Sequence, residues 1–409
     1  MKEDNCHCSG QYDSRSKELR AKIQHYLAAA KDIDTGFKLK NVFAENKRRI
    51  MDLLSADEEQ WNDWKWQLGN RITTVEMMKR FIPLSNREID NIERVGKRYR
   101  WAISPYYLSL MDSKNSSCPI RMQAVPTIQE LKEDGDADPM AEEATSPVAG
   151  VVRRYPDRLI IKVTNSCGMF CRHCQRRRSI GDRDRQASFT QLKAAIRYIK
   201  QHGEIRDVLL TGGDGLLIND QLLDWILGEL REIPTVEIIR IGTRTLVTMP
   251  QRITDDLCRV LERYHPIYIN THFNHPREIT LDAAQAADKL TRAGVPLGNQ
   301  AVLLKGINDD VSIMKKLNHE LLKIRIRPYY IFHPVNTTGT QHFHVKIQRG
   351  MEIMEGLRGY TSGLANPVYI VNAPGGYGKI PVMPNYILSW GTDHVILRTW
   401  EGKVFRYPN

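Results

Sequence analysis

Residues 159–174 read Leu-Ile-Ile-Lys-Val-Thr-Asn-Ser-Cys-Gly-Met-Phe-Cys-Arg-His-Cys, an apolar, β-branched run followed at once by three closely spaced cysteines. The run at 159–163 predicts a strand, and the polar segment after it predicts a loop. Cys167, Cys171 and Cys174 have the spacing C-x3-C-x2-C, so three thiolates on one loop can ligate three irons of a 4Fe–4S cluster. No fourth cysteine follows nearby, which leaves one iron open to a substrate or cofactor. A zinc site is disfavoured, because cysteine-only structural zinc sites use four ligands.

Outward from this stretch, the chain alternates between short apolar runs and helical patterns. The apolar runs predict strands at 159–163, 208–210, 236–241, 267–269, 302–304, 329–332 and 368–371. The helical patterns between them lie at 192–199, 222–230, 283–290 and 313–322. This alternation predicts an α/β fold with a parallel sheet and crossover helices. Because there are six or seven units and no GxGxxG after the first strand, we expect a partial (β/α)6-type barrel, with its chemistry at the C-terminal ends of the strands.

The composition narrows the class of protein. The chain has 409 residues and a net charge of +11, and its seven cysteines are too few for a disulfide framework. It contains neither an apolar run of ~18 residues nor a secretory signal, so we expect a cytoplasmic protein without a membrane partner. The basic charge suits an enzyme that binds phosphates and carboxylates. Because no OB or RRM pattern is present, nucleic acid is a disfavoured partner.

The cysteine loop carries the signature of radical S-adenosylmethionine enzymes, and longer motifs narrow the resemblance. Residues 171–178 (CRHCQRRR) resemble the corresponding segment of the lysine 2,3-aminomutase family. The other segments that resemble this family are 59–66 (EQWNDWKW), 154–158 (RYPDR), 270–276 (NTHFNHP), 294–300 (GVPLGNQ) and 327–330 (RPYY). The resemblance covers residues 44–409 and implies a radical enzyme with an N-terminal helical domain.

The residue patterns and the extent of the resemblance together divide the chain into segments. Residues 1–43 are expected to be a variable N-terminal extension, in which Cys6-His7-Cys8 can bind a metal but more simply belongs to a loose tail. The other expected segments are a helical domain at 44–111, a linker at 112–150, the barrel at 151–372 and a C-terminal segment at 373–409. Capping-box patterns begin at Ser55, Thr73 and Ser85 and predict helix starts in the helical domain.

The resemblance implies that S-adenosylmethionine binds the open iron through its amino and carboxyl groups and is cleaved to a 5′-deoxyadenosyl radical. Thr211-Gly212-Gly213-Asp214 is similar to the glycine-rich motif that holds the methionine amino group. His173, His272 and Gln300 match positions that line the same site.

The resemblance implies a second cofactor, pyridoxal 5′-phosphate. Residues 373–379 (APGGYGK) resemble the family segment APGGGGK, whose lysine forms an imine with that cofactor, so Lys379 is implied as the pyridoxal lysine. A P-loop is excluded, because no Ser or Thr and no helix pattern follows the lysine. The resemblance assigns Arg176 to the substrate carboxylate. It assigns the cofactor phosphate and ring to Arg154, Arg158 and Tyr155.

The implied reaction is an isomerisation that moves the α-amino group of an amino acid to C3. The radical removes a hydrogen from C3, and the amino group migrates through a three-membered intermediate while it is joined to pyridoxal. An electron donor such as flavodoxin or ferredoxin would reduce the cluster, and a homo-oligomer is expected.

Two positions predict that the substrate is not lysine. Lysine-specific members hold the substrate ammonium with two aspartates, where this chain has Val335 and Asn372. A buried ammonium without a counter-charge is costly. The glutamate branch also has asparagine at the second position, although it has a lysine where Val335 stands. We therefore expect glutamate or another non-lysine amino acid. The alternatives are a lysine or arginine 2,3-aminomutase and, more remotely, a radical enzyme that modifies RNA or protein.

Overall fold

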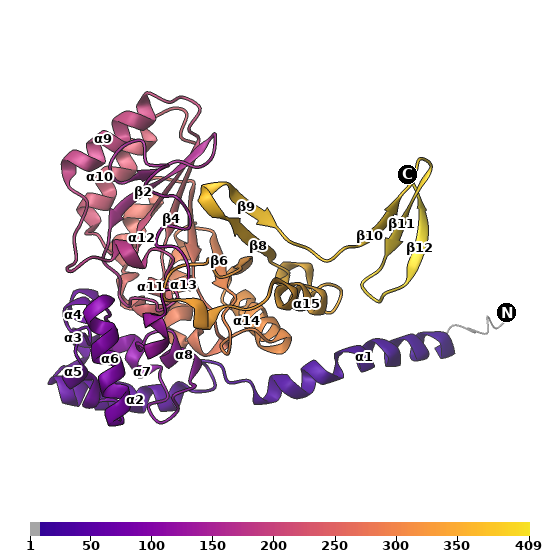
Figure 1. The fold of residues 1–409 in the computed structure, drawn as a ribbon, viewed down its shortest axis with the longest axis horizontal. Helices are drawn as coiled ribbons and strands as arrows, with labels where there is room; N and C mark the ends of the chain where they lie inside the picture. Colours follow the sequence, from indigo (N-terminus) through magenta and orange to yellow (C-terminus); the bar gives the residue numbers. More distant parts are fainter. Residues whose placement is uncertain (1–8) are drawn as a thin grey trace, which may run out of the picture.

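A curled nine-stranded sheet forms the body of the molecule in the computed structural model, which describes residues 9–409 (Figure 1). The Cys6-His7-Cys8 hypothesis lies outside the described residues. The strands follow one another across the sheet in chain order. They are β1 (Val151–Val152), β2 (Arg158–Thr164), β3 (Asp207–Gly212), β4 (Ile238–Gly242), β5 (Ile267–Thr271), β6 (Leu297–Val302), β7 (Arg327–Phe332), β8 (Val368–Ala373) and β9 (Gly378–Pro381).

Neighbouring strands from β2 to β8 are parallel, whereas β1 and β9 pair antiparallel at the two edges. Helices connect the parallel strands. They include α9 (Phe189–Lys200), α10 (Asp220–Arg231), α12 (Asp255–Glu262), α13 (Leu281–Arg292), α14 (Val311–Lys323) and α15 (Ile347–Leu357). The predicted partial barrel with crossover helices is thus confirmed.

The period-two pattern of the strands separates the core from the site. On β2, Leu159 and Ile161 are buried in the same apolar core as Leu192 of α9. Ile160, between them, lines a cavity on the opposite face, and Leu209 of β3 does the same. Successive strand residues point to opposite faces of the sheet. One face of the sheet therefore builds the core and the other builds the site.

The strand predicted at 302–304 was placed too late in the chain. The strand is β6, which ends at Val302, and Leu303 and Leu304 continue as a buried loop. The prediction missed β6 because its middle is polar. Asn299 is buried there and exchanges hydrogen bonds with the backbone of Phe273, at 2.7 and 3.0 Å.

Helices precede the sheet. They are α1 (Ser9–Asp32), α2 (Lys40–Leu54), α3 (Glu58–Asn62), α4 (Trp64–Gly69), α5 (Val75–Lys79), α6 (Asn86–Arg98) and α7 (Pro105–Ser109). The capping box at Ser85 is confirmed. The predicted start at Ser55 was wrong, because this residue ends α2 in a left-handed conformation and Asp57 caps α3 instead. Thr74, one residue after Thr73, caps α5.

Residues 112–150 contain the short helices α8 (Pro119–Met122) and η1 (Ile128–Leu131) and pack against the end of the barrel. The backbone N–H of Asp136 donates to Asn336 O after β7, and that of Gly375 donates to Pro139 O, both at 3.0 Å. This segment therefore lies beside the loops that border the site.

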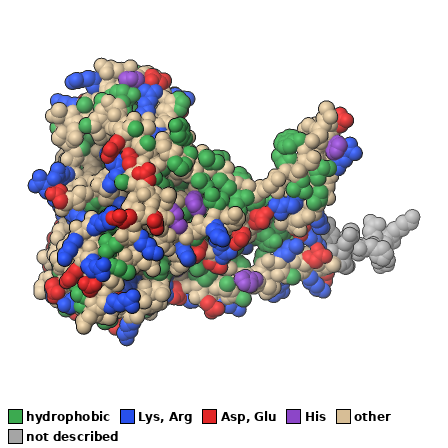
Figure 2. All heavy atoms as spheres, viewed as in Figure 1, with side chains coloured by type: hydrophobic (Ala, Val, Ile, Leu, Met, Phe, Trp, Pro, Cys, Tyr) green, Lys and Arg blue, Asp and Glu red, His purple; other side chains and the backbone are tan. Residues whose placement is uncertain are grey.

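A second, three-stranded sheet projects from the body beside α1 (Figure 1). Its strands are β10 (Ile387–Trp390), β11 (His394–Arg398) and β12 (Val404–Pro408). Arg15 of α1 forms an ion pair with Glu401 of this sheet at 2.9 Å. Figure 2 shows hydrophobic side chains gathered on the projection. Among the described residues, we find no helix with the length and apolar character needed to cross a membrane.

Candidate active site

The C-terminal ends of the parallel strands open into a cavity of about 310 Å³. Almost every residue that the sequence singled out lies on its wall. These residues are Arg154, Cys167, Cys171, His173, Cys174, Arg176, Thr211, Gly212, Gly213, Asp214, His272, Gln300, Val335, Asn372 and Lys379. The two exceptions are Tyr155 and Arg158, which do not line the cavity. They stack on each other, with the Arg158 guanidinium 3.9 Å from the Tyr155 ring centroid.

The cysteine loop is held in place by residues from outside the barrel. Arg71 of the helical domain donates to Cys167 O at 2.7 Å, and the Phe170 N–H donates to Ala102 O at 3.1 Å. Arg172, only 1% exposed, donates two nitrogens to the buried carboxylate of Glu130. A buried, bidentate Arg–carboxylate pair fixes both partners. The helical domain and residues 112–150 therefore position the cysteines.

The three thiols line the cavity beside a buried arginine. Burial raises the pKa of the Cys167 thiol, and raises that of Cys174 to about 11. Arg244 donates from Nη1 to Cys171 Sγ at 2.7 Å. Within residues 9–409, no three His, Cys, Asp or Glu side chains are close enough to share one ion. Three cysteines on one loop suit a 4Fe–4S cluster, in which each thiolate binds a different iron.

The glycine-rich turn after β3 packs directly on the cysteine loop. A Cβ atom at Gly213 would lie 2.4 Å from Ser166 O, and Gly212 has a φ of +122°. Only glycine fits such a close approach. Asp214, 3% exposed, accepts hydrogen bonds from Thr243 Oγ1 at 2.6 Å and from the Arg244 N–H at 2.7 Å. This carboxylate therefore ties the ends of β3 and β4 together.

Several polar atoms on the cavity wall have no protein partner. His173 and His272 stack with ring centroids 5.5 Å apart, and burial lowers the pKa of both well below the usual value. Among the described residues, no hydrogen-bond partner is found for the buried atoms His173 Nδ1, Asn270 Nδ2 and Thr271 Oγ1. Buried polar atoms normally have a partner. These three atoms are therefore available to a polar cofactor such as S-adenosylmethionine.

Lys379 lies on β9, directly opposite Asn372 of β8. Its Nζ atom is 5.4 Å from the Tyr330 ring centroid and 5.6 Å from that of Phe332. The side chain is open to solvent in the cavity but has protein on most sides. Burial and the positive charges of Arg240, Arg158 and Arg154 lower its pKa to about 8. A lysine with such a pKa is an effective nucleophile near neutral pH.

The turn before Lys379 forms a close cradle with an arginine. Gly376 has a φ of +80°, and a Cβ atom there would lie 2.8 Å from Met140 O and 3.1 Å from the Arg154 side chain. Burial lowers the pKa of Arg154, whose Nη1 makes one long hydrogen bond, at 3.4 Å, to Met140 O. The charges of Arg154 and Arg158 thus make the surroundings of the Lys379 amine positive.

Arg176 is joined to a buried carboxylate that the sequence did not single out. Its Nε atom donates to Glu142 Oε1 at 2.7 Å, and its side chain reaches the cavity. The neighbouring Arg177 is instead buried, with hydrogen bonds to Glu130 and to Gly339 O. Sequence reasoning missed Glu142, because it lies in a segment without helical or strand periodicity. It also missed Arg244 and His333, although both follow strand ends, where chemistry gathers in such folds.

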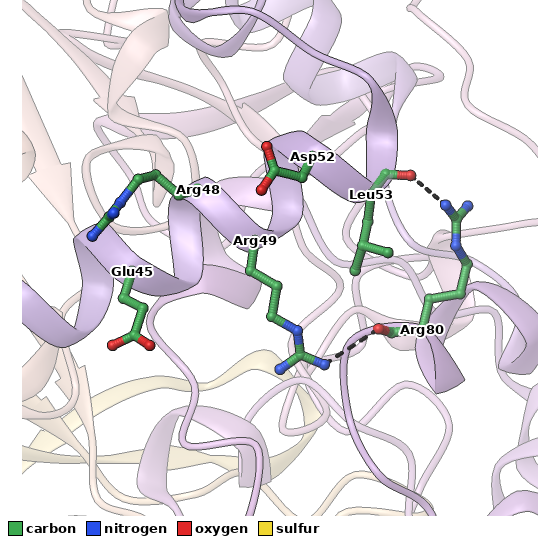
Figure 3. A pocket seen from close by; sticks show the side chains of 6 residues that line it. All are labelled: Glu45, Arg48, Arg49, Asp52, Leu53 and Arg80. Atoms are coloured by element: carbon green, nitrogen blue, oxygen red, sulfur yellow. Dashed lines mark hydrogen bonds between the residues drawn. The ribbon is translucent and has the colours of Figure 1, made fainter.

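A second pocket lies on the helical domain and is lined mainly by charged side chains (Figure 3). Arg49 there donates to Arg80 O at 3.4 Å, and Arg80 donates to Leu53 O. Its walls contain none of the predicted site residues. They consist of Glu45, Arg48, Arg49, Asp52, Leu53 and Arg80.

Comparison with known families identifies the class of protein. Residues 161–317 match the radical SAM superfamily, and residues 354–409 match the family described as lysine-2,3-aminomutase. The protein is a radical S-adenosylmethionine enzyme.

Comparison with individual relatives identifies the family to which the chain belongs within this class. It is 55% identical to glutamate 2,3-aminomutase of Clostridioides difficile, over 96% of this chain and 93% of that protein. It is 51% identical to L-lysine 2,3-aminomutase of Fusobacterium nucleatum, over 86% of this chain and 84% of that protein. It is 50% identical to L-lysine 2,3-aminomutase of Bacillus subtilis, over 90% of this chain and 80% of that protein. The chain belongs to the lysine 2,3-aminomutase family, whose members are isomerases. Its cofactors are a 4Fe–4S cluster, S-adenosylmethionine and pyridoxal phosphate, and the residues described above fit all three.

Proposed function

We propose that this aminomutase acts on glutamate, moving its α-amino group to C3 to give the β-amino acid. The observation that carries the proposal is the charge of the cavity. Its wall contains four cationic side chains, Arg154, Arg176, Arg244 and Lys379, and one acid, Asp214, which is already hydrogen-bonded. No other carboxylate on this wall, among the described residues, can balance the ammonium of a lysine substrate.

The two positions that distinguish lysine enzymes support this choice. Val335 and Asn372 line the same cavity as Lys379. Asn372 and Lys379 face each other across the β8–β9 ladder, so their side chains project from the same face of the sheet. The amide of Asn372 can donate to a carboxylate oxygen. The similarity to glutamate 2,3-aminomutase is consistent with an acidic side chain at this end of the cavity.

Different arginines are suited to the α-carboxylate of the substrate and to the phosphate of the cofactor. Arg176 uses Nε for Glu142, which leaves its terminal nitrogens free for the α-carboxylate of the substrate. Arg154 and Arg158, which surround the amine of Lys379 with positive charge, are suited to the phosphate of the pyridoxal cofactor. Tyr155 stacks on Arg158 and contacts the turn at Gly378, where it can support the cofactor ring.

When bound, the cluster and S-adenosylmethionine supply a 5′-deoxyadenosyl radical, and pyridoxal phosphate supplies a carrier for the migrating amino group. The protein's residues hold and orient these groups. Lys379 offers a neutral amine for covalent attachment near pH 8. His173 and His272, uncharged at neutral pH, add no positive charge beside a cationic sulfonium. Thr211, Gln300 and the Gly212-Gly213 turn border the same space.

We further propose that the enzyme is a cytoplasmic homo-oligomer, reduced by a one-electron carrier such as flavodoxin or ferredoxin. The projecting sheet supports an oligomer, because Trp390 is 71% exposed and Val404 and Tyr407 are each 56% exposed. An apolar surface of this kind commonly marks a protein interface.

A substrate panel tests the glutamate proposal. Anaerobically reconstituted enzyme is incubated with glutamate, lysine, arginine and alanine, and kcat/KM for each β-isomer is measured, with Lys379→Ala as the inactive control. We expect kcat/KM for glutamate to exceed that for lysine by at least about tenfold, since the loss of a charge pairing lowers binding by that factor or more. A preference for lysine would refute the substrate but leave the aminomutase assignment in place.

A further inference from the structure

One imidazole on the cavity wall has no role in the function proposed above. His333 follows the end of β7 and lines the cavity together with Val335 and Asn372. Its backbone N–H donates to Ile370 O of β8 at 2.7 Å. This hydrogen bond fixes the His333 backbone between β7 and β8, on the same cavity wall as Val335 and Asn372.

Tyr369 determines which nitrogen of His333 carries the proton. The Tyr369 side chain is fully buried, and its hydroxyl lies 2.7 Å from His333 Nδ1, its only hydrogen-bond partner among the described residues. Burial raises the pKa of this hydroxyl, so it keeps its proton. Because Nδ1 is the one acceptor within reach of this buried O–H among the described residues, the hydroxyl donates to Nδ1. Burial lowers the pKa of His333 to about 4, so the ring is neutral and its own proton lies on Nε2. No hydrogen bond to the Nε2 atom is found within residues 9–409, and the His333 side chain is only partly buried on the cavity wall.

The Tyr369 ring is itself held by a helix. A Cβ atom at Gly350 of α15 would lie 2.2 Å from Tyr369 Cζ, so the ring packs directly on the helix backbone. The contacts from Gly350 to Tyr369 and on to His333 therefore orient one N–H donor in advance. A donor fixed before the ligand arrives costs less to use in binding.

We propose that His333 is a specificity-determining residue, whose Nε2–H donates to the carboxylate at the end of the substrate side chain. The inference rests on the proposed function, because it names the residue that recognises the acidic side chain. Asn372 supplies a second donor at the same end of the cavity. The same N–H group disfavours a lysine substrate, since an ammonium is also a donor and cannot accept from it.

The test compares two substrates that differ only in the group that His333 would bind. Glutamate carries the carboxylate, and norvaline replaces it with a methyl group. We compare His333→Leu, His333→Gln and Tyr369→Phe, with His202→Gln as a control histidine outside the cavity wall. Norvaline is measured as a substrate and as a competitive inhibitor, and iron content and circular dichroism confirm that each variant folds.

His333→Leu should lower kcat/KM for glutamate by roughly 10- to 100-fold, the worth of a hydrogen bond to a charged group, and leave the values for norvaline nearly unchanged. His333→Gln, whose side chain can also present an N–H, should recover part of the loss. Tyr369→Phe should raise KM for glutamate selectively, because the ring is no longer held in one tautomer.

Two results would overturn the inference while the proposed function stands. One is full glutamate activity in His333→Leu. The other is an equal loss with glutamate and norvaline, which would indicate a purely structural role. If the unmodified enzyme isomerises lysine and not glutamate, the proposed function fails and the inference fails with it.

Discussion

The pKa of Lys379 sets the pH range in which this residue can attach covalently to its cofactor. Because the pKa is lowered to about 8, the amine is protonated below that pH and neutral above it. The rate of covalent pyridoxal attachment should therefore rise about tenfold per pH unit up to about pH 8 and then level off. Borohydride trapping of the imine measures this rate in protein without a cluster.

Arg158→Gln provides a matched variant for that profile. The change removes one of the positive charges that lower the Lys379 pKa, so the midpoint should move to higher pH. A midpoint near the ordinary lysine pKa in the unmodified protein would show that Lys379 lies in a more solvated environment.

The three cysteines of the loop should each be indispensable for the cluster. After anaerobic reconstitution, we expect about four irons per chain in the unmodified protein and loss of the cluster in Cys167→Ala, Cys171→Ala and Cys174→Ala. Cys118→Ala and Cys258→Ala are the controls, because both thiols are buried away from the cavity wall. Full iron content in a loop variant would contradict the ligand assignment.

At the scale of elements, the β8–β9 hairpin and the loop after β7 together set the substrate. Val335→Asp combined with Asn372→Asp places two carboxylates on the cavity wall. We expect kcat/KM for lysine to rise and that for glutamate to fall, since the pocket then attracts an ammonium and repels a carboxylate. Amino acid analysis of the β-isomers measures both. An unchanged preference would mean that these positions do not contact the side chain.

Local patterns predicted most strands, because each strand buries one face in the core and therefore has an apolar, β-branched run such as 159–163. They failed at β6, since the polar residues Asn299 and Gln300 interrupt its apolar pattern. Nearly all of the site residues that the motifs identified lie on the cavity wall. The motifs could not reveal Glu142, which reaches Arg176 from a segment of irregular structure, or Tyr369, whose role depends on its contacts with Gly350 and His333. Such partners are set by tertiary packing alone.

At the scale of the whole molecule, the projecting sheet β10–β12 and the helix α1 extend beyond the barrel (Figure 1). If this surface joins copies of the chain, Trp390→Asp should weaken assembly, because it puts a charge into an apolar contact. Leu364→Asp is the control, since Leu364 is also exposed but lies outside this sheet. Sedimentation velocity should show smaller species for Trp390→Asp only. An identical distribution for both would argue against this interface.

Isotope-labelled substrate can show directly whether the nitrogen of glutamate migrates from C2 to C3. Reconstituted enzyme is given glutamate with 15N on the amino group and 13C at C3, and the product is followed by NMR. We expect a product in which 15N is bonded directly to the 13C at C3, and no such product with Lys379→Ala. Glutamate that keeps its nitrogen at C2, or releases it as ammonia, while lysine is isomerised, would show that glutamate is not the substrate of this aminomutase.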